Sequence, residues 1–108
     1  MTDWRQISIR PDQTIREALE VIDEGAIQIA IIADEQDRLQ GVVTDGDIRR
    51  GILEDLDLDT PVSSVMNEEP ITARPQEDRE SLIDTMRARR IHQIPLVDRD
   101  GRVVGIEV

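Results

Sequence analysis

The residues best suited to chemistry in this sequence lie between positions 41 and 50, where a predicted strand ends and a predicted helix begins. A helix start favours an anion, because free backbone amides and the positive end of the helix dipole point toward it. The Thr44 hydroxyl can donate to a phosphate there, and the Asp47 carboxylate can accept hydrogen bonds from a ribose diol. Arg49 and Arg50 add positive charge nearby. The segment is therefore a candidate site for a phosphate and a sugar.

The same residues also have a purely structural interpretation. Thr44 and Asp47 have the T-x-x-D spacing of a capping box, in which each side chain bonds a free backbone amide at the start of its own helix. Spacing alone favours this interpretation over ligand binding. Both interpretations predict a helix that begins just after Thr44.

Catalytic and metal-binding motifs find little support elsewhere in the sequence. The single histidine, His92, lies on a predicted strand and belongs to no HExxH motif, and no GxSxG motif occurs. All 13 basic residues are arginine and there is no cysteine, which excludes chemistry that needs a lysine amine or a thiolate. Residues 55–59 alternate carboxylates as a calcium loop does, but Thr60 and Met66 occupy the positions that require Gly and Glu.

Composition narrows the classes of partner. The chain has 108 residues, of which 38% are hydrophobic, so it can form one compact domain or two small intertwined repeats. A net charge of -11 disfavours nucleic acids and anionic membranes, and the absence of Phe and Tyr removes the rings on which single strands stack. No apolar run approaches the ~20 residues that span a bilayer, and the start lacks the apolar core of a signal peptide. We therefore expect no nucleic-acid or membrane partner and a cytoplasmic location.

The sequence repeats itself at an offset of 64 residues. The matches fall on turn residues, and three of the four apolar positions of a predicted helix recur as well. The chain is therefore divided into a first repeat, residues 1–60, and a second repeat, residues 61–108. The matched pairs include Ile7 and Ile71, Arg10 and Arg74, Pro11 and Pro75, Ile27 and Ile91, Asp34 and Asp98, Arg38 and Arg102, and Gly41 and Gly105.

Both repeats predict the same order of elements, which gives an α/β (α+β) fold of two βαββα-type units with pseudo-twofold symmetry. A helix follows the first strand of each repeat, and in the first repeat Thr14 and Glu17 cap it and Gly25 ends it. A short helix closes the first repeat, whereas the second repeat stops at Val108 before its own T-x-x-D position, as in a piece of a longer chain. Strands are predicted over residues 7–9, 28–33 and 39–43, and again over 71–73, 92–97 and from 103 to the end.

The repeat and the T-x-x-D segment together resemble a CBS-domain pair, also called a Bateman module. Residues 14–52 resemble the family's helix, strand, hairpin and closing G-h-x-T-x-x-D-I motif. In the second repeat, residues 61–72 and 90–106 resemble the family's lead-in segment and strand pair. More narrowly, residues 1–25 and 43–52 resemble the CBS pair that precedes a sugar-nucleotide transferase domain of the mannose-1-phosphate guanylyltransferase-like kind.

This resemblance implies a non-catalytic regulatory module with a nucleotide site in the cleft between the repeats. It implies that Thr44 contacts the phosphate, Asp47 the ribose, and Gln28 and Ile29 the edge of the base, with Arg49 and Arg50 nearby. One arginine of the second repeat, among Arg74, Arg89 and Arg90, is expected to add charge for the phosphate.

The resemblance also implies ligands and partners. An adenosine-type nucleotide is expected, namely AMP, ADP, ATP or S-adenosylmethionine, and no cofactor is required. The expected partners are a second copy, bound through the CBS helices, and a C-terminal nucleotidyltransferase domain that the module regulates. The alternative function is a ligand-free dimerisation scaffold of that enzyme.

Overall fold

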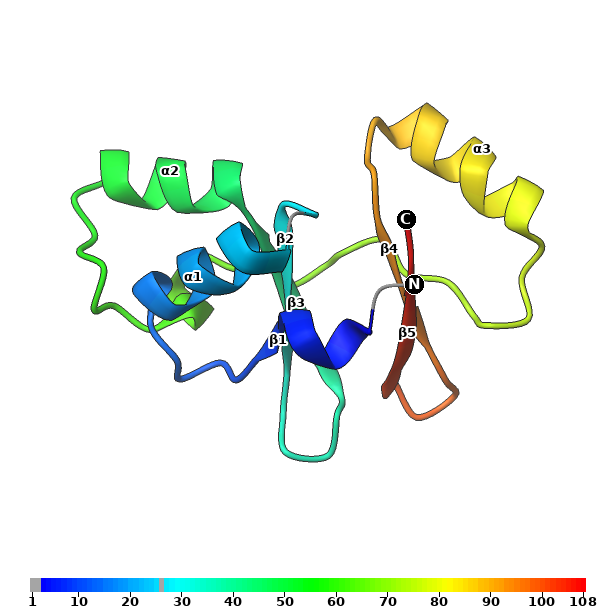
Figure 1. Cartoon of the computed structure of the whole chain (residues 1–108), viewed down its shortest axis with the longest axis horizontal. Coiled ribbons are helices and arrows are strands. Elements are labelled where there is room, and N and C mark those ends of the chain that lie inside the picture. The colour runs from blue at the N-terminus through cyan, green and yellow to red at the C-terminus, as the bar shows by residue number, and fades with distance from the viewer. Residues whose placement is uncertain (1–2, 26) are drawn as a thin grey trace.

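The computed structural model describes residues 3–25 and 27–108, which form two small sheets with helices beside them (Figure 1). The first repeat contains β1 (Ser8–Ile9), α1 (Ile15–Gly25), β2 (Ile29–Ala33), β3 (Leu39–Thr44) and α2 (Asp45–Leu53), after the 3-10 helix η1 (Trp4–Ile7). The second repeat contains the 3-10 helix η2 (Val62–Ser64), α3 (Arg79–Arg89), β4 (Ile94–Val97) and β5 (Val103–Glu107). This order confirms the α/β (α+β) fold of two related units.

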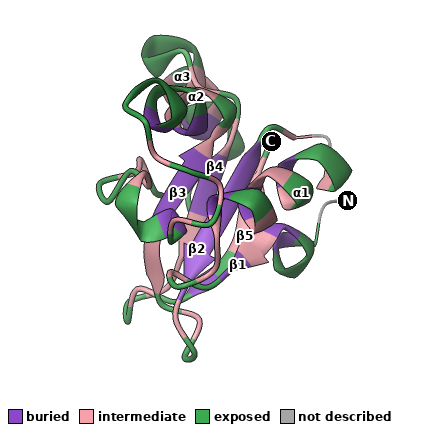
Figure 2. Cartoon of the chain, turned by 90° about the vertical axis from the view of Figure 1, so that its left-hand side faces the viewer, coloured by how far each residue is buried: buried purple, intermediate pink, exposed green. Residues whose placement is uncertain are grey.

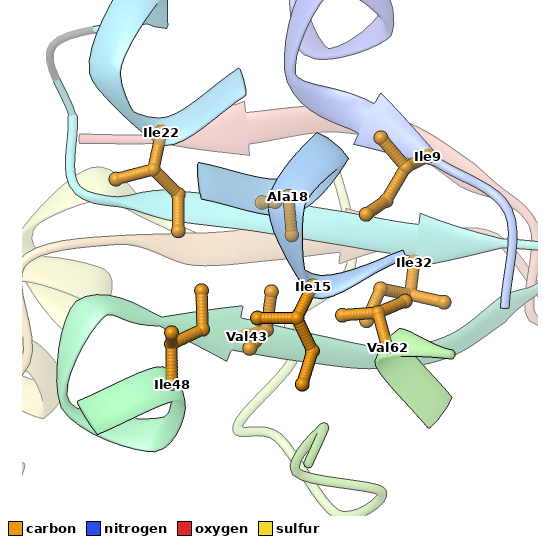
Figure 3. Packing of buried hydrophobic residues seen from close by; sticks show 9 residues of the cluster. Ile9, Ile15, Ala18, Ile22, Ile32, Val43, Ile48 and Val62 are labelled. Carbon is orange, nitrogen blue, oxygen red and sulfur yellow. The ribbon is translucent and has the colours of Figure 1, made fainter. Parts of the chain in front are cut away.

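The core of the first repeat forms around β2, whose five residues are all buried. Its side chains alternate between two clusters, because successive residues of a strand point to opposite faces. Ala30 and Ile32 belong to the cluster that contains Ile15 of α1 and Ile48 of α2, and Figure 3 shows Ile32, Ile15 and Ile48 together. Ile29, Ile31 and Ala33 belong to the second cluster, on the other face. The prediction that this strand is buried on both faces is confirmed.

The first helix begins as the sequence predicts. The Glu17 amide donates to Thr14 Oγ1 at 3.1 Å, and the Thr14 amide donates to Glu17 Oε1 at 3.2 Å, which completes a capping box. The buried residues of α1, Ile15, Ala18 and Ile22, lie on one face of the helix and pack on the sheet.

The repeat extends to local backbone details. Asp34 Oδ1 accepts from the amides of Gln36 and Arg38, and Asp98 Oδ1 accepts from those of Asp100 and Arg102, 64 residues later. Both hairpins then have a residue of positive φ, Asp37 at 65° and Gly101 at 79°. Each strand pair also has an irregular register at matching places, between Ile32 and Ala33 and between Leu96 and Val97.

Several predicted strand bounds are wrong. Residues 71–73 form no strand, because only Ala73 pairs, with Leu96 in a parallel bridge. His92 and Gln93 precede β4, which begins at Ile94, and Gln28 precedes β2 with a φ of 64°. Ile7 belongs to η1, since Asp3 caps that short helix by accepting from the Arg5 amide.

The connection between the repeats packs on the first repeat rather than crossing freely. The amides of Ile15 and Arg16 donate to the carbonyls of Thr60 and Leu58, both at 2.9 Å, and Val62 is fully buried among the residues of the first core. An ordered connection was predicted here and is confirmed. The boundary between the repeats after residue 60 stays a prediction.

The two repeats share a hydrophobic interface. Val103 and Ile106 of β5 pack with Trp4, Ile7 and Val42, and buried strands occupy the middle of the molecule, with exposed helix faces outside (Figure 2). The hairpins β2–β3 and β4–β5 turn at one end of the molecule, whereas α2 and α3 lie at the other (Figure 1).

Candidate ligand-binding site

A pocket of about 400 Å³ lies between the two repeats, and we call it the inter-repeat pocket. Its volume falls within the range of ~300–1,000 Å³ that is usual for small-molecule sites. One wall comes from β2, β3 and the start of α2, and the other comes from the second repeat. The lining residues are Ile29, Val42, Thr44, Asp47, Asn67, Glu69, Pro70, Ile71, Arg89, Ile91, Gln93 and Pro95.

Thr44 and Asp47 form a complete capping box at the edge of the inter-repeat pocket. Asp47 Oδ2 accepts from the Thr44 amide at 2.9 Å and from Thr44 Oγ1 at 3.0 Å, and the Asp47 amide donates to Thr44 Oγ1 at 3.3 Å. The structural interpretation of the T-x-x-D spacing is therefore confirmed. Because the Thr44 hydroxyl donates its proton to Asp47, this end of the pocket presents oxygen acceptors rather than a free hydroxyl donor.

Three of the six predicted site residues line the inter-repeat pocket, namely Ile29, Thr44 and Asp47. Gln28, Arg49 and Arg50 do not. Arg49 pairs with Asp45 at 3.1 Å, and Arg50 pairs with Asp47 Oδ1, so both arginines are held on the surface of their own helix. The roles predicted for these residues stay predictions.

The second repeat supplies residues that sequence reasoning missed. Ile29 and Gln93 are 64 residues apart and both line the inter-repeat pocket, so the repeat register itself was a signal for Gln93. Gln93 lines the pocket, and its side-chain amide nitrogen donates to the Ile27 carbonyl, so the side-chain oxygen keeps its acceptor capacity. Of the three arginines considered for phosphate charge, Arg89 lines the pocket, and Arg74 and Arg90 do not.

The segment that contains Glu69 is attached to the edge of β3 through Asn67. Its main chain forms two hydrogen bonds with Val42, of 2.8 and 3.1 Å, and its side-chain oxygen accepts from the Glu69 amide at 3.0 Å. Gly41 permits this approach, because a Cβ at that position would lie 2.6 Å from the Asn67 carbonyl oxygen. No local sequence signal reveals this crossing.

The pseudo-symmetric counterpart of the inter-repeat pocket is filled. Ile7, Ile29 and Ile106 are the repeat equivalents of Ile71, Gln93 and Val42, and they pack together with Trp4, of which 9% is exposed. The second repeat reaches the first position of its T-x-x-D motif, one residue further than we expected. That position is Val108, which stands 64 residues after Thr44 and has no hydroxyl group.

Further features of residues 3–25 and 27–108 lie outside the inter-repeat pocket. There is no group of three His, Cys, Asp or Glu side chains that could hold a metal ion, and none of the described helices is long and apolar enough to cross a membrane. In the acidic segment 55–59, Asp57 accepts from the amide of Asp59 and the hydroxyl of Thr60. A smaller pocket of about 280 Å³ is lined by Arg5 and Asp37, but these two pair with each other at 2.9 Å.

Comparison with curated proteins finds relatives among larger enzymes and among small proteins. The chain is 30% identical over 100 residues to inosine-5'-monophosphate dehydrogenase of Methanocaldococcus jannaschii, covering 93% of this chain and 19% of that protein. It is 31% identical to a probable arabinose 5-phosphate isomerase of Haemophilus influenzae, covering 92% and 30%. It is 35% identical to the CBS domain-containing protein YhcV of Bacillus subtilis, covering 92% and 70%. The chain thus spans a fifth to a third of the enzymes it matches.

Solved structures give the same fold. The CBS domain protein PAE2072 of Pyrobaculum aerophilum, complexed with AMP, matches with a TM-score of 0.81 and 27% identity over 94% of this chain and 78% of that one. The CBS domain pair of protein MJ0100, in complex with 5'-methylthioadenosine and S-adenosyl-L-methionine, also matches with a TM-score of 0.81 and 27% identity, over 94% and 83%.

The family model for the CBS domain matches residues 2–54 and again residues 62–106, nearly the whole chain. Two matches in one chain indicate two CBS domains. The chain therefore belongs to the CBS-domain family and forms a pair of CBS domains.

Proposed function

We propose that this CBS pair is a regulatory module that binds an adenosyl ligand in the inter-repeat pocket. The observation that carries this proposal is the composition of the pocket wall, which draws on both repeats and combines aliphatic residues with a few polar groups. Two related structures, each 27% identical to this chain, are complexes with AMP and with 5'-methylthioadenosine and S-adenosylmethionine, respectively. ADP and ATP belong to the same ligand class, and no cofactor is required.

The groups of the pocket suggest how such a ligand lies in it. Aliphatic side chains, including Ile29, Val42 and Ile71, offer a slot for the flat base. The free oxygen of Gln93 suits the amino group of adenine and repels the carbonyl oxygen of guanine. The Asp47 side chain is 15% exposed, and its carboxylate accepts three hydrogen bonds within the protein, which leaves one acceptor position for a ribose hydroxyl.

Ligand binding between the repeats supplies a physical route to regulation. A ligand that contacts both walls stabilises the arrangement of the repeats in which both contacts are made, and it shifts the population toward that arrangement. We propose that this shift biases a catalytic domain attached after the second repeat, of the mannose-1-phosphate guanylyltransferase-like kind. In this proposal the two units meet at residue 60 and the protein acts in the cytoplasm.

A second candidate function is a ligand-free dimerisation scaffold. The observation in its favour is the outer face of α2, where Ile52 is 47% exposed and Leu53 is 77% exposed. Large apolar side chains exposed side by side mark a surface that a second copy can cover. Light scattering with and without AMP separates the candidates, since a pure scaffold forms the same dimer in both and loses it in Leu53→Ser.

Calorimetric titration of the whole chain tests ligand binding directly. We expect AMP or S-adenosylmethionine to bind, and Asp47→Asn and Gln93→Leu to weaken binding at least tenfold. Asp45→Asn is the matched control, because Asp45 lies on the same helix, also pairs with an arginine, and does not line the inter-repeat pocket. If no adenosyl ligand binds at millimolar concentration, the proposed function is wrong.

A further inference from the structure

The charge of the inter-repeat pocket is set by few residues. Among the described residues that line it, Asp47 and Glu69 carry negative charge and Arg89 carries positive charge. Asp47 is already paired with Arg50 outside the pocket. The balance that a ligand meets beyond its ribose is therefore decided between Glu69 and Arg89.

Neither arginine of α2 compensates Glu69. Arg49 and Arg50, which the sequence offered as phosphate ligands, pair with Asp45 and Asp47 and do not line the inter-repeat pocket. The capping box adds no donor either, because the Thr44 hydroxyl donates to Asp47 at 3.0 Å. A chain of phosphates would therefore find a single guanidinium, that of Arg89, offset by the Glu69 carboxylate, in a molecule whose net charge is -11.

Glu69 is also held at the pocket by its backbone. Its amide donates to Asn67 Oδ1 at 3.0 Å, and Asn67 is fixed to β3 by two main-chain hydrogen bonds with Val42. The exposed Glu69 side chain extends from this fixed backbone at the pocket, and a carboxylate there is a repulsive element of the kind that excludes the wrong ligand from a site.

We infer that Glu69 makes the inter-repeat pocket selective for adenosyl ligands with at most one phosphate, including the sulfonium S-adenosylmethionine, and against polyphosphates. This inference rests on the proposed function and adds the charge of the ligand to it. Each further phosphate adds negative charge beside Glu69, whereas the positive sulfonium is attracted to the same carboxylate.

The experiment compares Glu69→Gln with Glu68→Gln by calorimetric titration at low salt, without divalent cations, using adenosine, AMP, ATP and S-adenosylmethionine. Glu68 is the neighbouring residue and does not line the inter-repeat pocket, so its variant makes the same change in net charge outside the pocket wall. In the unmodified chain we expect ATP to bind at least tenfold more weakly than AMP. In Glu69→Gln we expect ATP to bind about threefold to tenfold more tightly, S-adenosylmethionine to bind more weakly, and adenosine to bind unchanged.

If Glu69 had only a structural role, its substitution would not shift the affinities for ATP and S-adenosylmethionine in opposite directions. Equal affinity of the unmodified chain for AMP and ATP would overturn the inference while leaving the proposed function intact. Identical behaviour of Glu69→Gln and Glu68→Gln would do the same. Failure of all four ligands to bind the unmodified chain would remove both.

Discussion

Arg38 and Arg102, which hold the same position in the two repeats, pair with each other in an antiparallel bridge. The Leu39 amide donates to the Gly101 carbonyl at 2.9 Å, and the Val103 amide donates to the Asp37 carbonyl at 2.8 Å. Each of these hydrogen bonds becomes the other when the repeats are exchanged. The pseudo-twofold axis predicted from the 64-residue offset thus passes through this main-chain contact. We call the contact between residues 37–39 and 101–103 the hairpin clasp.

Gly101 gives the hairpin clasp its conformation and provides the first prediction. Its φ is 79°, and a Cβ there would meet nothing within 4 Å, so a substitution acts through the backbone alone. We expect Gly101→Ala to lower the free energy of unfolding by about 1–2 kcal/mol, and Gly101→Asn to lower it less, because asparagine tolerates the left-handed region. Urea denaturation measures both, and an alanine variant as stable as the unmodified chain would contradict the argument.

Gly41 provides a prediction about the place where the segment of Asn67 and Glu69 crosses β3. A Cβ at this buried glycine would lie 2.6 Å from the Asn67 carbonyl oxygen and 3.1 Å from the Met66 sulfur. We expect Gly41→Ala to destabilise the chain by about 1–3 kcal/mol through overpacking, and to weaken ligand binding as well. The control is Gly46→Ala in α2, where the nearest atom would be 3.6 Å away and alanine favours the helix. Equal losses of unfolding free energy in the two variants would contradict the argument that a Cβ at residue 41 crowds Asn67.

The core beneath α1 provides a prediction about stability. Ile15 is fully buried, whereas Leu53 is 77% exposed. We expect Ile15→Ala to cost about 2–5 kcal/mol of unfolding free energy, from lost burial and the cavity left behind. Leu53→Ala in α2 should stay within about 0.5 kcal/mol, because its side chain contributes little to the core. Denaturant midpoints compare the two variants directly.

The pH dependence of stability follows from Glu17. Hydrogen bonds from the Gln13 side chain and then the Thr14 amide lower the pKa of the Glu17 carboxyl from its ordinary 4.5. Because the folded pKa lies below the unfolded one, the ionised group stabilises the fold above pH 4.5, and this contribution disappears as the pH falls through the folded pKa.

We therefore expect the difference in Tm between the unmodified chain and Glu17→Gln to shrink as the pH falls from 6 to 3. Glutamine retains the capping geometry but does not titrate, so it isolates the charge. Thermal unfolding followed by Trp4 fluorescence or circular dichroism measures it. A difference that stays constant over this range would show that Glu17 acts only as a neutral cap.

The main lines of the fold were predictable because repeated residues impose repeated backbone geometry. Asp34 and Asp98 accept the same pair of amides, and the aliphatic run of β2 is buried on both faces, as its composition indicates. The strand predicted before α3 was wrong, because neighbouring apolar residues such as Ile71 face the inter-repeat pocket instead of pairing. Sequence reasoning could not tell these two uses of an aliphatic residue apart.

The candidate site was predictable on one wall. Thr44 and Asp47 were found from their spacing, and their mutual hydrogen bonds account for that spacing. The other wall depends on where the segment around Asn67 crosses β3, which is a long-range main-chain contact without a local signal. Arg49 and Arg50 each pair with a carboxylate of their own helix and do not line the inter-repeat pocket, and their role as phosphate ligands stays a prediction.

The hairpin clasp lies at one end of β3 and the inter-repeat pocket at the other. Leu39 makes the clasp and Thr44 lines the pocket, six residues that span roughly 17 Å at the rise of an extended strand. The clasp consists of two main-chain hydrogen bonds that the pseudo-twofold relation exchanges. A rotation of one repeat about the clasp would therefore displace the residues near Thr44 more than those near Leu39, because displacement grows with distance from the axis of rotation.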